Sequence, residues 1–162
     1  LGGLEAWRGG GVDVSEQQAA LDEIRAVVEP ETDRAAALER AVAILKARVP
    51  AYTWVGIYLL EGDELVLGPF LGAPSPHTRI PLNTGICGAA ASQKQTIVVD
   101  DVNADPRYLA CSLEVQSEIV APIMRGGRVF GEIDIDSNTP AAFGAADRAL
   151  VEATAAILAA KF

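Results

Sequence analysis

Two apolar segments of the chain, residues 117–124 and 129–136, are joined by the turn Arg125-Gly-Gly-Arg128. Each segment has the length and the β-branched content of a strand, and paired glycines suit the tight turn of a β-hairpin. This hairpin constrains the fold more than any other feature, because it commits the C-terminal half of the chain to an antiparallel sheet. Residues 52–60 form a third strand-like segment, rich in aromatic and β-branched residues.

Alternation along the three segments separates two faces of the predicted sheet. Successive side chains of a strand point to opposite faces. The isoleucines of the hairpin therefore share one face, which we expect to lie under the helices. The other face carries five candidate site residues, namely Trp54, Tyr58, Glu118, Asp134 and Asp136. Burying a carboxylate without a partner costs several kcal/mol, on the order given by the transfer of polar groups, so these acids indicate a ligand pocket.

The strand at residues 52–60 makes the prediction more detailed. Its alternation assigns Tyr52 to the aromatic face together with Trp54, Gly56 and Tyr58. Because Gly56 has no side chain, we expect it to leave room for a ligand on that face. The aliphatic side chains of the same strand should pack on the helices.

Apolar residues at helical spacing predict four helices around this sheet. The first begins at a capping box, Ser15 to Gln18, and ends at Glu29-Pro30, and Thr32 is the expected cap of the second, which stops at Pro50. A short helix is expected from Asn83 through Gln93, and a last one over residues 145–158. The sequence therefore predicts an α+β fold, with helices on one face of an antiparallel sheet and a ligand pocket on the other.

Length and charge limit the classes of partner. The 162 residues suit one domain, which we place at residues 15–162, after a Gly-rich flexible arm at residues 1–14. A net charge of −9 argues against a nucleic acid or an anionic membrane as partner. The sequence has no apolar run of membrane-spanning length and nothing resembling a secretory signal, so we expect a cytoplasmic protein with reduced cysteines. No Cys/His cluster has zinc-site spacing, and we expect neither a metal nor a cofactor.

Cys111 is the first candidate for chemistry, because it lies in a polar loop that leads directly into the strand carrying Glu118. An inert, half-buried thiol is the ordinary alternative, since free cysteine is among the most buried residue types. Nearby carboxylates would raise the pKa of a thiol, so activation needs a positive group. Arg79, Arg107 and a helix N-terminus are the candidates, and the sequence does not choose among them.

Other candidates have equally plain alternatives. Cys87 falls in the first turn of the short helix, where backbone N–H groups favour a thiolate, but it can also be a small residue packed between glycines. Trp54 and Tyr58 can be ordinary core aromatics, and Asp136 can belong to a strand end. His77 lies in a proline-flanked loop, and we expect it to be exposed.

A set of short motifs resembles the GAF-domain free methionine-(R)-sulfoxide reductases. The resemblance runs from about Tyr52 to the C-terminus, with the motifs in the same order and at nearly the same spacing. The motifs are Trp54-Val-Gly-Ile-Tyr58, Leu67-Gly-Pro-Phe70, Arg79-Ile-Pro81, Gly85-Ile-Cys-Gly88, Ala110-Cys111, Ser117-Glu-Ile-Val120 and Asp134-Ile-Asp-Ser137. The resemblance implies a GAF fold, an antiparallel sheet flanked by helices, in a protein that is often a homodimer.

The resemblance also implies roles for the candidate residues. Cys111 matches the catalytic nucleophile, and Cys87 matches a further cysteine of the family. Trp54 and Tyr58 match aromatics around the methyl-sulfoxide end of the substrate, while Glu118, Asp134 and Asp136 match acids that hold the amino acid and the sulfoxide oxygen. Two positions depart from the family. His77 replaces the usual resolving cysteine, and Glu132 replaces a residue that is usually apolar or neutral.

The implied activity is the reduction of free methionine-(R)-sulfoxide, which leaves a cysteine sulfenic acid on the enzyme. Cys87 or an external thiol condenses with the sulfenic acid, and thioredoxin or another thiol reductant then reduces the resulting disulfide. The His77 replacement keeps an alternative open, a sensory GAF domain that binds a small amino-acid-like ligand without turnover. A third alternative is an interaction module that dimerises through its N-terminal helices.

Overall fold

The structure is a computed structural model that describes residues 14–110 and 112–162. Its four α-helices are α1 (Val14–Val27), α2 (Arg34–Arg48), α3 (Gly85–Gln93) and α4 (Ala145–Ala159). Its strands are β1 (Trp54–Glu61), β2 (Glu64–Leu71), β3 (Arg79–Pro81), β4 (Ile97–Val99), β5 (Ser117–Arg125) and β6 (Arg128–Ser137). The predicted flexible arm falls almost wholly on residues 1–13, which lie outside the described residues, and it stays a prediction.

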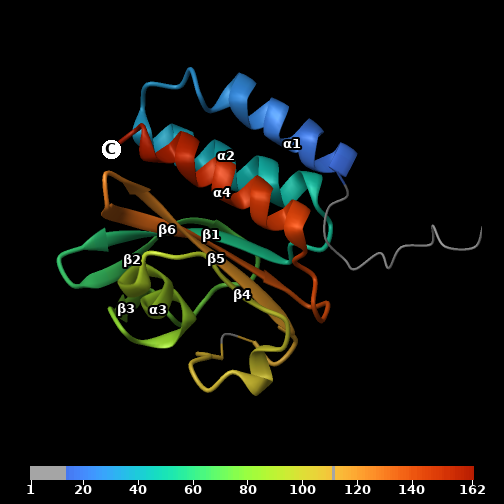
Figure 1. Ribbon diagram of the computed structural model, residues 1–162, viewed down its shortest axis with the longest axis vertical. Helices are drawn as coiled ribbons and strands as arrows, with labels where there is room; N and C mark the ends of the chain where they lie inside the picture. Colours follow the sequence, from blue (N-terminus) through green and yellow to red (C-terminus); the bar gives the residue numbers. More distant parts are fainter. Residues whose placement is uncertain (1–13, 111) are drawn as a thin grey trace, which may run out of the picture.

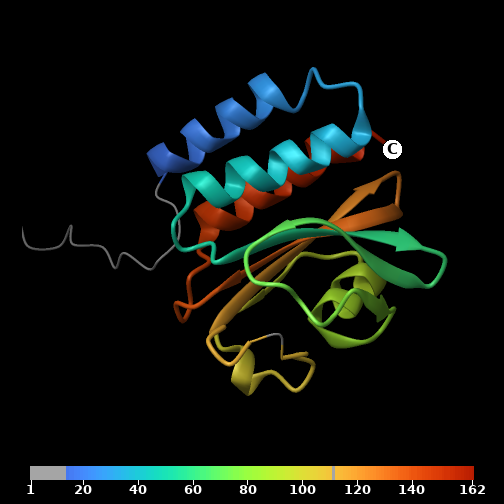
Figure 2. The ribbon, with the colours of Figure 1, turned by 180° about the vertical axis from the view of Figure 1, so that it is seen from behind.

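The six strands form one antiparallel sheet with the order β3-β2-β1-β6-β5-β4. Helices α1, α2 and α4 lie together on one face, and α3 lies on the other (Figures 1 and 2). Each face has its own hydrophobic cluster. The first joins the three helices to Val55, Ile57 and the isoleucines of the hairpin, and the second joins α3 to Trp54 and Tyr58. The predicted α+β fold is confirmed.

The strand register brings the predicted site residues to one face. On the β5–β6 hairpin, Glu118 pairs with Asp136 and Val120 with Asp134. Strand β1 pairs with the other side of β6, so that Trp54 is opposite Asp136 and Tyr58 is opposite Glu132. The alternation predicted from the sequence therefore holds for all three central strands, and it collects acids and aromatics on the face opposite α1, α2 and α4.

Tyr52 corrects the expected start of the aromatic face. Strand β1 begins at Trp54, so the strand alternation does not extend to Tyr52. The Tyr52 ring is instead fully buried in the helix-side cluster, 5.6 Å from the ring of Phe143 between centroids. Its hydroxyl donates a 2.6 Å hydrogen bond to Oδ1 of Asp147 in α4, which fastens the entry of β1 to the helix layer.

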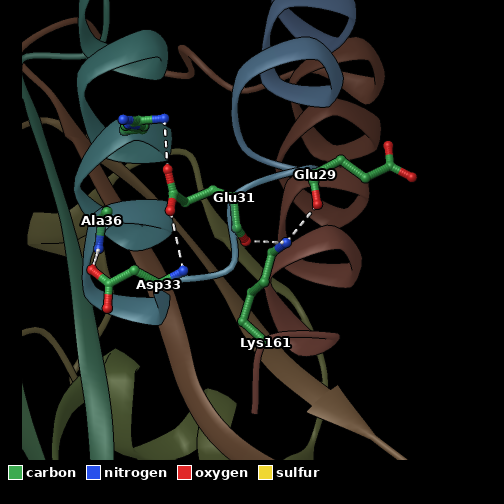
Figure 3. A network of polar contacts seen from close by, with 6 residues as sticks. Glu29, Glu31, Asp33, Ala36 and Lys161 are labelled. Atoms are coloured by element: carbon green, nitrogen blue, oxygen red, sulfur yellow. Dashed lines mark hydrogen bonds and ion pairs between the residues drawn. The ribbon is translucent and has the colours of Figure 1, made fainter.

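The N-terminus of α2 is also capped differently from the prediction. Asp33, rather than Thr32, is the N-cap, and its carboxylate accepts a 3.0 Å hydrogen bond from the N–H of Ala36. Figure 3 shows that this end of the helix lies beside the C-terminus of the chain, where Lys161 donates to the backbone carbonyls of Glu29 and Glu31 at 2.6 and 2.8 Å. These contacts tie the α1–α2 connection to the end of α4.

No described helix is both long enough and apolar enough to cross a bilayer.

Candidate functional site

Four buried carboxyl groups form the centre of the site. Glu118 comes from β5 and Glu132, Asp134 and Asp136 come from β6, and each is at most 5 % exposed. Burial is the main cause that raises the pKa of all four, and the charges of neighbouring acids add to it for Glu118, Glu132 and Asp136. Among the described residues, no lysine or arginine forms an ion pair with any of them. The cluster therefore retains protons to higher pH than free carboxyl groups do.

Aromatic residues of β1 border this cluster and fix the loop that follows β2. The Trp54 indole stacks on Phe70 with 5.7 Å between centroids, and its N–H donates to the carbonyl of Ala73 at 3.0 Å. The Tyr58 hydroxyl donates to the carbonyl of His77 at 2.8 Å. Two hydrogen bonds from the sheet thus hold the loop at residues 72–78 over the edge of the site.

Gly56 has a different role from the predicted one. A Cβ atom built on Gly56 would lie 2.2 Å from the nearest carbon of the Trp54 six-membered ring. The indole therefore covers Gly56 and uses the space that the sequence analysis assigned to a ligand. The absence of a side chain at residue 56 permits the stacked position of Trp54.

Cys87 lies under the acidic face, in the first turn of α3. It is 5 % exposed, and its Sγ atom donates a 3.4 Å hydrogen bond to Oδ2 of Asp134. Burial first, and then the nearby carboxyl groups of Asp134, Glu132 and Glu118, raise the pKa of the thiol well above its usual value. Of the two alternatives for Cys87, burial agrees with the small packed residue, because desolvation and acidic neighbours favour the thiol over the thiolate.

Two small cavities lie beside the acids. One, of about 20 Å³, is lined by Tyr58, His77, Ile80, Gly85, Ile86, Cys87, Leu109, Glu118 and Asp134. The other, of about 80 Å³, is lined by Thr53, Trp54, Ala73, Pro74, Ser75, Ser112, Glu114, Val115, Asp136 and Asn138. Cys111 itself lies outside the described residues. Leu109 and Ser112, on either side of it in sequence, line the first and second cavity respectively.

His77 is half-buried rather than exposed, which corrects the prediction for this residue. Its Nε2 atom lies 3.1 Å from the carbonyl oxygen of Ala110, so the imidazole reaches the residue directly before Cys111. Of the candidate positive groups, Arg107 is engaged by Asp105 in a 2.8 Å ion pair. The N-terminus of α3 is in contact with the same loop, since a Cβ atom at Gly85 would lie 2.8 Å from the Leu109 side chain.

Strand alternation predicts Glu132 on the same face as Asp134 and Asp136, and the register agrees. Its complete burial and its place beside Cys87 were not predicted. Among the described residues, neither Glu132 oxygen has a hydrogen-bond partner, although Glu132 is completely buried. The contact of α3 with β6 joins residues 47 positions apart, and no local pattern signals it.

Comparison with known proteins gives consistent matches. The GAF domain family profile matches residues 33–162. The free methionine-R-sulfoxide reductase of Escherichia coli is 38% identical over 115 residues, which cover 71% of this chain and 69% of that protein. A free methionine-R-sulfoxide reductase from Neisseria meningitidis, solved with its substrate, superposes with a TM-score of 0.88 at 39% identity, covering 98% of this chain and 96% of that one. A type II free methionine-R-sulfoxide reductase from Thermoplasma acidophilum gives 0.74 at 34% identity, covering 90% and 94%.

Proposed function

This chain belongs to the GAF-domain family and, within it, to the free methionine-R-sulfoxide reductases, and on that premise we propose that it reduces free L-methionine-(R)-sulfoxide to methionine. One observation carries the proposal beyond the family likeness. A cluster of buried carboxyl groups, which no lysine or arginine in the described part of the chain pairs with, adjoins aromatic side chains and the segments on either side of Cys111. A substrate with an ammonium group and a sulfoxide supplies both the cation and the acceptor that such a cluster lacks.

The acids divide into two tasks in this proposal. Ionised members of the set Glu118, Asp134 and Asp136 bind the substrate ammonium, which selects the free amino acid over a methionine sulfoxide inside a peptide. A protonated member donates to the sulfoxide oxygen, since burial and acidic neighbours favour the neutral form. Trp54 and Tyr58 hold the methyl-sulfoxide end of the substrate.

The reaction then transfers one oxygen atom. The Cys111 thiolate attacks the sulfoxide sulfur while a carboxylic acid protonates the oxygen. The attack forms a transient bond between the two sulfur atoms. The hydroxyl group then moves to the Cys111 sulfur as the S–O bond of the substrate and the transient S–S bond break, so that methionine leaves and Cys111 is a sulfenic acid. The sulfoxide sulfur is reduced by two electrons and the cysteine sulfur is oxidised by two. A second thiol condenses with the sulfenic acid and releases water, and a dithiol reductant such as thioredoxin restores the starting thiols.

Two thiols are candidates for the condensation, because His77 stands where the family usually has its resolving cysteine. Cys87 is the candidate within the chain. Its burial and its raised pKa require that it becomes exposed or loses its proton before it reacts. An external thiol is the alternative, and it would need only access to Cys111.

We further propose that the enzyme is a cytoplasmic homodimer whose residues 15–162 form one domain.

An assay of NADPH oxidation, coupled through thioredoxin and its reductase, tests the activity. We expect turnover on free methionine-(R)-sulfoxide, no turnover on the (S) epimer or on a sulfoxide-containing peptide, and none with Cys111→Ser. Unchanged turnover of Cys87→Ser would assign the condensation to an external thiol. Tight binding of the sulfoxide without methionine formation would contradict the enzyme and support the sensory alternative, which the His77 replacement favours.

A further inference from the structure

One buried group of side chains joins three residues of the proposed reaction, Cys87, Glu118 and Asp134, to Glu132, which that reaction does not use. Cys87 of α3 lies near Glu118, Glu132 and Asp134, and the register of β1 with β6 puts Tyr58 opposite Glu132. The Cys87 Sγ atom and one carboxylate oxygen from each of Glu118 and Asp134 lie within 4.8 Å of one another. These are a thiol and two carboxyl groups that converge from α3, β5 and β6.

From this group we infer a binding site for a single divalent cation of the zinc class, with Cys87, Glu118 and Asp134 as ligands and Glu132 as the fourth. Zinc sites in proteins combine cysteine sulfur and carboxylate oxygen at about 2.3 and 2.0–2.2 Å, which places neighbouring ligand atoms roughly 3.5 Å apart in a tetrahedron. The Sγ–Oδ2 separation of 3.4 Å between Cys87 and Asp134 already fits that edge. One oxygen each from Glu118 and Asp134 lies within 4.8 Å of that sulfur and of the other oxygen. Glu132, whose carboxyl group is near Cys87, completes the set by turning its side chain toward these atoms.

Buried oxygens of the same group point independently to a cation site. Within residues 14–110 and 112–162, Oδ1 of Asp134 and both carboxylate oxygens of Glu132 have no hydrogen-bond partner, and the two residues are 4 % and 0 % exposed. The Glu132 carboxyl group also lies close enough to Cys87 to interact with its thiol. Buried polar atoms in native proteins are nearly always satisfied, so such a group of unpaired acceptors indicates a bound cation.

The cavity beside the Cys87 sulfur has room for a single ion. The cavity that Cys87, Glu118 and Asp134 line holds about 20 Å³, which is close to the volume that one water molecule or one ion requires. A sulfur ligand favours zinc-class ions over magnesium or calcium, which prefer all-oxygen sites of six or more ligands. The inference does not depend on the proposed reaction, since it uses only the ligand atoms and their burial.

Cadmium titration of the purified full-length chain in metal-free buffer tests the site, because a cadmium–thiolate bond gives an ultraviolet charge-transfer band. We expect the band to saturate at one ion per chain, to persist in Cys111→Ser and to be lost in Cys87→Ser. In Glu132→Gln, which keeps the size of the side chain, affinity should fall at least about tenfold. Circular dichroism verifies that each variant is folded, and Glu132→Gln decides the question if Cys87→Ser does not fold.

Three results would overturn the inference. They are the absence of a saturable band, a band that is lost in Cys111→Ser and kept in Cys87→Ser, and unchanged cadmium affinity in folded Glu132→Gln. Magnesium at the same concentrations serves as the matched ion without sulfur affinity, and it should not compete with cadmium. Effective competition by magnesium would likewise contradict a site built on the Cys87 sulfur.

Discussion

The substitution Gly56→Ala tests how the sheet positions the aromatic wall of the site. The added methyl group would lie 2.2, 2.6 and 3.0 Å from three carbons of the Trp54 six-membered ring, whereas ordinary contact begins near 3.4 Å. The indole must therefore move by more than 1 Å, as the difference between 3.4 and 2.2 Å requires. Such a movement disturbs both the stacking on Phe70 and the 3.0 Å hydrogen bond to Ala73.

The expected cost follows from the energetics of overpacked cores. Inserting a methyl group into a packed site costs about 1–3 kcal/mol. A domain of this size loses about 2–4 °C of melting temperature per kcal/mol, so the melting temperature of Gly56→Ala should lie about 2–12 °C below that of the parent. Binding of methionine sulfoxide should weaken as well, because Trp54 then lies outside its position in the proposed site.

A double-mutant cycle separates the clash from other effects of the methyl group. Trp54→Phe removes the outer ring atoms that the methyl group would meet, so Gly56→Ala should be neutral or slightly stabilising in that background, where alanine replaces a flexible glycine in a strand. Differential scanning calorimetry on the four proteins gives the coupling. Equal melting temperatures of Gly56→Ala and the parent would refute the reasoning, and so would the same loss in both backgrounds.

Three other predictions concern stability and metal binding. Tyr52→Phe removes the hydrogen bond to Asp147 and should lower the free energy of unfolding, measured in urea, by about 1.5–3 kcal/mol. The KM for the sulfoxide should stay unchanged, because Tyr52 faces the helices. A changed KM with unchanged stability would contradict this placement. Glu132→Met replaces a buried carboxyl group, which has no hydrogen-bond partner in the part of the chain that the structure describes, by an apolar side chain. This should raise the free energy of unfolding by about 1–3 kcal/mol. A loss of stability in urea unfolding would show that Glu132 is satisfied. Zinc should inhibit the reductase competitively with methionine sulfoxide, because the zinc ion and the substrate both bind Glu118 and Asp134. Inhibition that excess substrate does not relieve would contradict a shared site.

Much of the fold was predictable because strand alternation is a local property. The pattern of residues 117–136 fixed which side chains of β5 and β6 share a face, and the register confirms it. The same reasoning was wrong for Tyr52, because alternation says nothing about where a strand begins. It was also wrong about the space at Gly56, which depends on the rotamer of Trp54.

The site was predictable only to the extent that it lies on strands. Glu118, Asp134 and Asp136 follow from one registration of the hairpin with β1. The contact of Cys87 with Asp134 depends on how α3 docks on the sheet, which no periodicity encodes. The position of His77 beside Ala110 depends on the fold of two irregular loops. The roles assigned to Cys111 and to the acids rest on family resemblance and stay proposals.

The most direct test of the account is a single-turnover measurement without any added reductant. Reduced protein is mixed with excess methionine-(R)-sulfoxide, and the released methionine is counted by mass spectrometry together with the state of each cysteine. The account predicts one methionine per chain, with oxygen or a disulfide on Cys111, and no methionine from Cys111→Ser. Absence of methionine from the parent, or equal release from Cys111→Ser, would contradict it.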